Sequence, residues 1–162
     1  MKTVMVVVAM GLAAISCPAY SAERVNDTKP QTVQLVADKA QQYNVPLPLA
    51  LGIIETESSF NPRAHNRGNW GLGQIQCGTA RSLGMKGSCD QLLDPTINLN
   101  YSMSYLRAAL DVAKDDQCVA ATLYNRGLDK KLAKYSRYCV RVLGLVDIPK
   151  KHVIVSHNDK EQ

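Results

Sequence analysis

The chain has 162 residues, of which 46% are hydrophobic and 20% are charged. This composition excludes an intrinsically disordered chain and a membrane-embedded one, and the length is sufficient for one domain with its own hydrophobic core. The formal net charge is +5 without a long basic run, which argues against a nucleic-acid partner and favours a mildly anionic polymer.

The first residues are typical of a secretory signal peptide. A lysine precedes an apolar run over residues 4–15, which is too short for a transmembrane helix, and small residues surround a cleavage position after Ser21. We therefore expect residues 1–21 to be removed on export. A lipoprotein signal ending at Cys17 is the less favoured alternative, because Ala14 fits that pattern poorly.

Removal of the signal leaves four cysteines, and an even number in an exported chain predicts two disulfide bonds. Four cysteines allow three pairings. We favour Cys77–Cys89 with Cys118–Cys139, because each bond closes a short local loop; buried free thiols are the alternative. No two cysteines have the close spacing of a zinc knuckle and the histidines are scattered, so we expect no metal site.

The first half of the chain predicts two helices and a loop. Residues 22–30 are polar and are expected to form a linker, and apolar positions then recur at helical spacing from Gln31 to about Asn44. After a turn, Pro48 suits a first helical position, and a helix is expected over residues 49–57. It is apolar on nearly every side, which predicts a buried helix. Residues 59–73 are rich in Asn and Gly and predict a structured loop with a small β-hairpin.

The second half predicts mostly helices. Asp94-Pro95 is typical of a helix start, with Asp94 as the cap. The expected segments are a short helix over 79–83, a loop over 86–93, a long helix after Asp94, a helix over 118–124, a last helix over 132–143 with Tyr135, Tyr138 and Cys139 facing the core, and a polar tail over 146–162. The predicted fold class is mainly α, with a loop-rich insert and at most a small sheet.

The buried second helix ends on a carboxylate, Glu57. On a helix, Glu57 shares a face with Ile53 and Ile54. Burial raises the pKa of a carboxyl, and the negative end of the helix dipole adds a smaller effect, so Glu57 could keep a proton near neutral pH and donate it to a leaving oxygen. Periodicity alone leaves two alternatives: an ordinary solvated charge at Glu57, or Glu55 as the acid.

Four sequence blocks now become informative together. They are Glu57-Ser58-x-Phe60-Asn61-Pro62; Gly71-Leu72-Gly73-Gln74-Ile75 with Thr79-Ala80; Leu93-Asp94-Pro95 with Asn98-Leu99 and Tyr105-Leu106; and Ala121 with Tyr124-Asn125 and Gly127. In this order and spacing they resemble the soluble lytic transglycosylases, peptidoglycan-cleaving enzymes related in fold to goose-type lysozyme. The resemblance covers residues 31–145 and implies one lysozyme-like α+β domain with a saccharide cleft.

The resemblance implies a role for each block. Glu57 would be the sole catalytic acid/base, and Ser58 would hydrogen-bond near it. The loop 71–75, and Gln74 in particular, would line the saccharide cleft. Tyr124 would contact or orient the Glu57 carboxyl, and Asn125 would hold the part of the site where Tyr124 meets Glu57. Structural explanations stay open: the glycines could serve a tight turn, Tyr124 the core, and Asn125 a helix C-cap.

The sequence departs from the family in two places. Gly73 stands where the family usually has a methionine that would pack on the sugar. The loop before Gly71 carries Asn66-Arg67-Gly68-Asn69-Trp70 in place of the usual serine and Gly-Ala steps. Asn66 is aligned with that serine and is expected to bind substrate. Trp70, the only tryptophan, could stack on a sugar or pack beneath the loop.

The resemblance also implies the reaction. The bond between N-acetylmuramic acid and N-acetylglucosamine would be cleaved with formation of a 1,6-anhydro ring, without metal or cofactor. A hydrolytic muramidase of the same fold and a non-catalytic peptidoglycan-binding or envelope assembly factor are the alternatives. The implied setting is a monomer in the bacterial periplasm, with peptidoglycan glycan strands as the partner and a secretion or conjugation apparatus as a possible second one.

Overall fold

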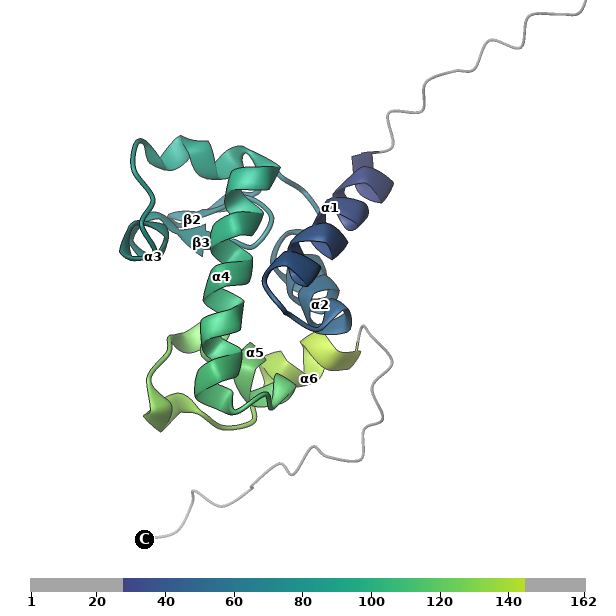
Figure 1. The fold of residues 1–162 in the computed structure, drawn as a ribbon, viewed down its shortest axis with the longest axis vertical. Coiled ribbons are helices and arrows are strands. Elements are labelled where there is room, and N and C mark those ends of the chain that lie inside the picture. The colour runs from purple at the N-terminus through teal and green to yellow at the C-terminus, as the bar shows by residue number, and fades with distance from the viewer. Residues whose placement is uncertain (1–27, 145–162) are drawn as a thin grey trace, which may run out of the picture.

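The computed structural model describes residues 28–144 (Figure 1). The predicted signal peptide, the lipoprotein alternative at Cys17 and the predicted tail over 146–162 lie outside the described residues. The elements in chain order are α1 (Thr28–Gln42), α2 (Leu47–Ser58), β1 (His65–Asn66), β2 (Asn69–Trp70), β3 (Ile75–Gln76), α3 (Cys77–Ser82), the 3-10 helix η1 (Cys89–Leu93), α4 (Pro95–Ala113), α5 (Gln117–Arg126), the 3-10 helix η2 (Lys130–Leu132) and α6 (Arg137–Gly144).

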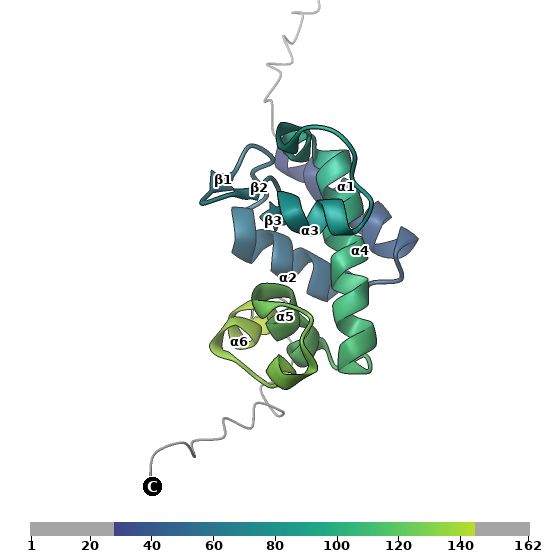
Figure 2. The same ribbon diagram turned by 90° about the vertical axis from the view of Figure 1, so that its left-hand side faces the viewer.

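The long helix α4 runs through the length of the molecule (Figure 1). The sheet and α3 lie toward one end of it, α5 and α6 lie toward the other, and α2 lies between these two groups (Figure 2). The main core joins α1, α2, α4, α5 and α6, and a smaller apolar cluster of Ile75, Ala80, Met85 and Leu92 lies beneath the sheet. The mainly α fold with a small sheet is confirmed. None of the helices within residues 28–144 has the length and apolar character needed to cross a membrane.

Helix α2 is buried as predicted, because its apolar residues contact helices on several sides. Leu49, Ile53 and Ile54 have no exposed surface. Gly52 allows α6 to approach closely, since a Cβ on Gly52 would lie 2.5 Å from the carbonyl oxygen of Val142. The helix begins two residues before the predicted start, with Pro48 in its first turn, where a missing N–H leaves no intrahelical bond unmade.

The predicted β-hairpin is confirmed and is extended by a third strand. The order is β1-β2-β3 and both pairs are antiparallel. The turn between β1 and β2 consists of Arg67 and Gly68, which have φ of 49° and 83°. Two successive positive φ angles are the requirement of a type I′ turn, whose twist matches that of the strands. The turn therefore fixes the hairpin that borders the cleft described below.

Several predicted boundaries are wrong. Helix α1 starts at Thr28, so part of the expected 22–30 linker is helical; Pro30 is tolerated because it occupies the first turn. The predicted helix over 132–143 is instead two pieces, η2 and α6. Ser136 explains this break, since its Oγ accepts a hydrogen bond from the Cys139 N–H at 3.3 Å and so caps a new helix. Similarly, the predicted loop 86–93 contains η1.

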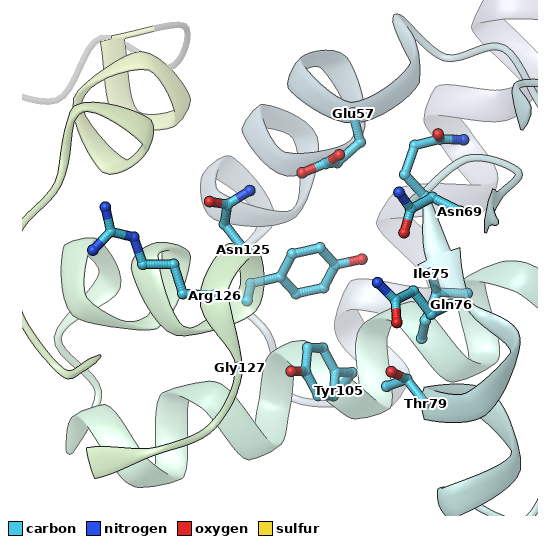
Figure 3. A pocket seen from close by; sticks show the side chains of 11 residues that line it. Glu57, Asn69, Ile75, Gln76, Thr79, Tyr105, Asn125, Arg126 and Gly127 are labelled. Carbon is cyan, nitrogen blue, oxygen red and sulfur yellow. The ribbon is translucent and has the colours of Figure 1, made fainter. Parts of the chain in front are cut away.

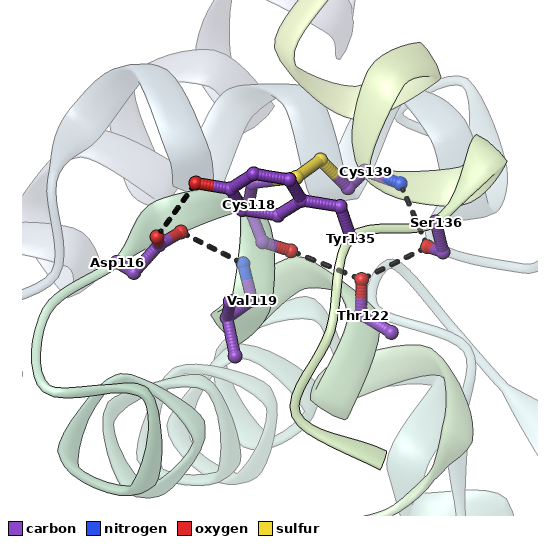
Figure 4. Close-up of a disulfide and its surroundings, with 7 residues drawn as sticks. All are labelled: Asp116, Cys118, Val119, Thr122, Tyr135, Ser136 and Cys139. Atoms are coloured by element: carbon purple, nitrogen blue, oxygen red, sulfur yellow. Dashed lines mark hydrogen bonds between the residues drawn. A yellow bond between two sulfur atoms is a disulfide. The ribbon is translucent and has the colours of Figure 1, made fainter. Parts of the chain in front are cut away.

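Both predicted disulfides are present. Cys77–Cys89 joins α3 to η1, and Cys118–Cys139 joins α5 to α6. Figure 4 shows the second disulfide and the hydrogen bonds around it. The hydroxyl of Thr122, in α5, forms a hydrogen bond of 2.9 Å with the hydroxyl of Ser136, which directly precedes α6. The start of α6 is therefore attached to α5 by both a covalent bond and a hydrogen bond.

Candidate active site

A cleft of about 340 Å³ opens between the end of α2, the sheet, α4 and α5 (Figure 3). Most of its lining side chains are polar and uncharged. The lining residues are Glu57, Asn69, Gln74, Ile75, Gln76, Thr79, Tyr105, Tyr124, Asn125, Arg126 and Gly127. The structure thus brings together four of the predicted site residues from three separate sequence blocks, and Glu57 is the only carboxyl among the lining residues described.

Glu57 lies in the last turn of α2 and is half-buried. The helix ends directly afterwards at Ser59, which adopts a left-handed conformation with φ 51°. Burial raises the pKa of the Glu57 carboxyl above its ordinary value, while a hydrogen bond from Tyr138 and the charge of Arg141 partly oppose that rise. The direction predicted from the sequence is confirmed. Glu55, the competing acid, lies outside the cleft, with its Oε2 atom 3.6 Å from Lys29 Nζ.

The sequence reasoning missed the closest partner of Glu57. The Tyr138 hydroxyl donates a hydrogen bond of 2.5 Å to Glu57 Oε1. Burial and the neighbouring Glu57 charge raise the pKa of Tyr138, so its hydroxyl keeps the proton that it donates. The guanidinium of Arg141 lies 5.6 Å from the Tyr138 ring centre. One signal was available in the sequence: the predicted Cys118–Cys139 bond attaches the neighbour of Tyr138 to the helix that contains Tyr124.

Tyr138→Phe is expected to move the alkaline limb of the pH–activity profile to higher pH. The Tyr138 hydrogen bond favours the Glu57 anion and lowers its pKa, so removing the hydroxyl raises the pKa further. A general acid stays protonated, and active, up to its pKa. Initial cleavage rates across pH measure the shift. Tyr135→Phe is the matched control, because the Tyr135 hydroxyl binds Asp116 and not Glu57; an equal shift in both variants would contradict the role of Tyr138.

Tyr124 lines the cleft with Glu57, and its hydroxyl hydrogen bond goes to the loop 71–75. The Tyr124 hydroxyl donates to the carbonyl oxygen of Gly73 at 2.7 Å and is not the group that donates to Glu57. Burial, followed by the Glu57 charge, raises the pKa of Tyr124. Its ring meets the Tyr105 ring edge-on at 5.4 Å. Tyr124 therefore holds the glycine-containing loop in place, while Tyr138 orients the carboxyl.

The loop 71–75 is held in place by hydrogen bonds from the Gln74 side chain and by close packing around Gly73. The Gln74 side-chain amide donates to the carbonyl oxygens of Ala64 and Gly71 at 3.0 and 2.9 Å. A Cβ on Gly73 would overlap Ser102 Oγ and lie 2.7 Å from the Tyr124 hydroxyl. This crowding explains why glycine occupies the position where the family usually has methionine, because no side chain fits there.

The remaining predicted site residues lie at or outside the edge of the cleft. Ser58 uses its hydroxyl within α2, donating to Ile54 O at 3.2 Å. Asn66 is exposed on β1 and is absent from the lining, where Asn69 of β2 is present. Trp70 stacks on His65 with ring centres 3.8 Å apart and packs against the cluster beneath the sheet, so its observed contacts are those of the packing alternative.

Of the last two predicted site residues, Gly71 has a structural role and Asn125 lines the cleft. Gly71 donates its backbone N–H to Ala64 O at 2.7 Å, which closes the loop, and Gly71 is absent from the cleft lining. Asn125 is not a C-cap, because α5 continues through Arg126 and is capped by Gly127. Asn125 is instead an exposed residue of the cleft lining.

Comparison with known proteins agrees with this geometry. The transglycosylase SLT domain matches residues 34–138. Membrane-bound lytic murein transglycosylase C of Haemophilus influenzae (strain PittEE) is 40% identical over 80 residues, which is 44% of this chain and 22% of that protein. A transglycosylase of Enterobacteria phage PRD1 is 37% identical over 79 residues, covering 48% of this chain and 28% of that protein.

Solved structures show the same fold. The 70 kDa soluble lytic transglycosylase of Escherichia coli has a TM-score of 0.56 and 26% identity over 68% of this chain and 18% of that chain. An inactive mutant of lytic transglycosylase Slt from Pseudomonas aeruginosa has a TM-score of 0.58 and 21% identity over 72% of this chain and 21% of that chain. The curated relatives are matched over about a quarter of their length. With more than half of its residues matched by the domain, this chain belongs to the transglycosylase SLT domain family.

Proposed function

We propose that this protein is a peptidoglycan lytic transglycosylase in which Glu57 acts first as the acid and then as the base. The observation that carries the proposal is the half-buried Glu57 with a raised pKa, the only carboxyl among the described residues that line the cleft. The names of the relatives, which include a lytic murein transglycosylase, support peptidoglycan as the substrate.

A lone carboxyl requires help from the substrate. Glycosidases that use two carboxylates hold them roughly 5–9.5 Å apart across the scissile bond, and the lining residues provide one. Glu57 would protonate the oxygen between N-acetylmuramic acid and N-acetylglucosamine, and the bond from that oxygen to the muramoyl anomeric carbon would break. The muramoyl N-acetyl group would stabilise the positive charge. The Glu57 carboxylate would then take the proton of the 6-hydroxyl as its oxygen bonds to the anomeric carbon.

The surroundings of Glu57 suit both halves of this cycle. Desolvation favours the protonated carboxyl, which is the form required to cleave the glycosidic bond. The Tyr138 hydrogen bond and the Arg141 charge favour the anion, which is the form required to accept the proton afterwards. Ring closure returns the proton to Glu57, so the cycle consumes no water.

The product identifies the reaction. We expect digestion of purified sacculi to release muropeptides with 1,6-anhydro ends, which mass spectrometry distinguishes from reducing ends by the mass of one water. Reducing ends without anhydro ends would contradict the proposal and identify a hydrolytic muramidase. Unchanged sacculi would contradict both and favour a non-catalytic peptidoglycan-binding or assembly protein.

The proposed location is the periplasm, reached through the signal peptide predicted over residues 1–21. Two disulfides in a small domain support an oxidising compartment. We propose further that the protein acts as a monomer on the cell wall, where a secretion or conjugation apparatus would require local opening of the glycan mesh.

A further inference from the structure

The net positive charge of the chain is concentrated in one stretch beside the cleft. Residues 126–141, called the cationic segment below, contain six Lys or Arg and one acidic residue, a net charge of +5 that equals the formal net charge of the whole chain. All six cations are exposed: Arg126, Lys130, Lys131, Lys134, Arg137 and Arg141. The rest of the sequence is therefore neutral in balance, and the positive field comes from this segment.

Local partners leave most of this charge available. The single acid of the segment, Asp129, accepts a hydrogen bond from the Lys131 backbone N–H at 2.9 Å. The salt bridges among residues 28–144 lie elsewhere, between α1 and α2 and near the end of α4. No salt bridge within these residues neutralises a cation of the segment, so the segment can attract an external anion.

The cationic segment has its two ends at the cleft lining and at the Tyr138–Glu57 pair. It begins at Arg126, a lining residue, and ends at Arg141, which lies over the ring of Tyr138. Figure 3 shows Arg126 on the side of the cleft away from Gln76 and Thr79. Figure 2 shows α5 and α6 at the end of the molecule opposite the sheet. A polymer in the cleft would thus meet neutral side chains at one side and the start of the cationic segment at the other.

We propose that the cationic segment binds the free carboxylates of the peptide stems of peptidoglycan, so that stem-bearing glycan is the preferred substrate. This inference rests on the proposed function. Neutral sugar rings give six exposed cations no partner, whereas each stem carries carboxylates that project from the glycan strand. Because the segment adjoins the cleft rather than a distant face, substrate is favoured over an anionic lipid surface. Exposed charge pairs are screened by salt, so the preference is expected to weaken as salt rises.

The test compares intact murein with murein from which an amidase has removed the stems and in which the lactyl carboxylates exposed by that cleavage have then been amidated, so that the stem-free glycan is uncharged. The triple variant Lys130→Gln, Lys131→Gln, Lys134→Gln alters no lining residue. We expect its KM for intact murein to rise roughly tenfold, the combined effect of three exposed charge pairs, with kcat unchanged and with no change on stem-free glycan. The matched control is Lys39→Gln, Lys86→Gln, Lys114→Gln, which removes the same charge elsewhere and is expected to leave KM unchanged.

Equal KM values for the two triple variants on intact murein would overturn the inference. So would an equal rise on stem-free glycan, since that would mean that the segment binds sugar. If the Lys130, Lys131 and Lys134 triple variant no longer sediments with phosphatidylglycerol vesicles but keeps its KM for intact murein, the inference would be overturned in favour of a membrane surface. Co-sedimentation of Glu57→Gln protein with intact or stem-free murein measures binding without cleavage, so this arm still decides the stem inference if the protein proves not to cleave glycan.

Discussion

Glu57→Gln is expected to abolish glycan cleavage while leaving the protein folded. Glutamine keeps the shape and can still accept the Tyr138 hydrogen bond, but it can neither donate a proton to the glycosidic oxygen nor take one from the 6-hydroxyl. General acid–base catalysis contributes about 10²–10⁴-fold to a rate. We expect a loss at the upper end of this range, because one residue carries out both proton transfers. Release of soluble muropeptides from sacculi measures it.

Two controls accompany this variant. Glu55→Gln removes an equal charge from the same helix, and because Glu55 lies near Lys29 and outside the cleft, its cleavage rate should match that of the unaltered protein. An equal loss in both variants would contradict the assignment of Glu57 as the acid.

Folding provides the second control. Since the folded state raises the pKa of Glu57, its ionisation opposes folding, and stability is lost as pH rises through the folded pKa. Glu57→Gln should therefore unfold at an equal or higher denaturant concentration than the unaltered protein at pH 7, and this advantage should vanish below the ordinary carboxyl pKa. A destabilised variant at pH 7 would instead attribute its inactivity to misfolding.

Asn98→Ala is expected to destabilise the protein more than any other polar-to-alanine change in α4. The Asn98 side chain is fully buried and joins three segments. Its amide donates to Trp70 O and Leu92 O at 2.7 and 2.8 Å, and its Oδ1 accepts from the Gly73 N–H at 2.8 Å. Alanine would leave these backbone groups buried without partners, at about 1–3 kcal/mol each. We expect a loss of about 4 kcal/mol in the free energy of unfolding.

Urea denaturation measures this loss, and Asn100→Ala is the matched control. Asn100 lies two residues along the same helix, and within the described residues its Oδ1 makes no hydrogen bond. Removing it should change the free energy of unfolding by less than about 1 kcal/mol. Similar losses in the two variants would contradict the bracing role of Asn98. Because Asn98 holds Gly73, we also expect Asn98→Ala to raise KM at temperatures where the protein remains folded.

The elements with strong local signals were predicted well. Asp94 caps α4 by accepting a hydrogen bond of 2.8 Å from the Ile97 N–H. A capping residue followed by proline predicts a helix start from local sequence alone. Helix boundaries that depend on competing local bonds were predicted less well. The periodicity over 132–143 indicated one helix, but the Ser136 cap and the disulfide to α5 divide this region into η2 and α6.

In the candidate site, too, features with a local sequence signal were predictable and contacts between distant segments were not. The sequence by itself determined the helical fold and both disulfides and led to the proposal of Glu57 as the acid, because these follow from periodicity, cysteine spacing and ordered motifs. The tertiary structure decided what surrounds Glu57. Tyr138 is far from Glu57 in sequence and reaches it only because α6 packs against α2 and is attached to α5. Contacts between distant segments depend on packing, which no local pattern encodes, and for this reason Tyr138 and the crowding at Gly73 were found only in the fold.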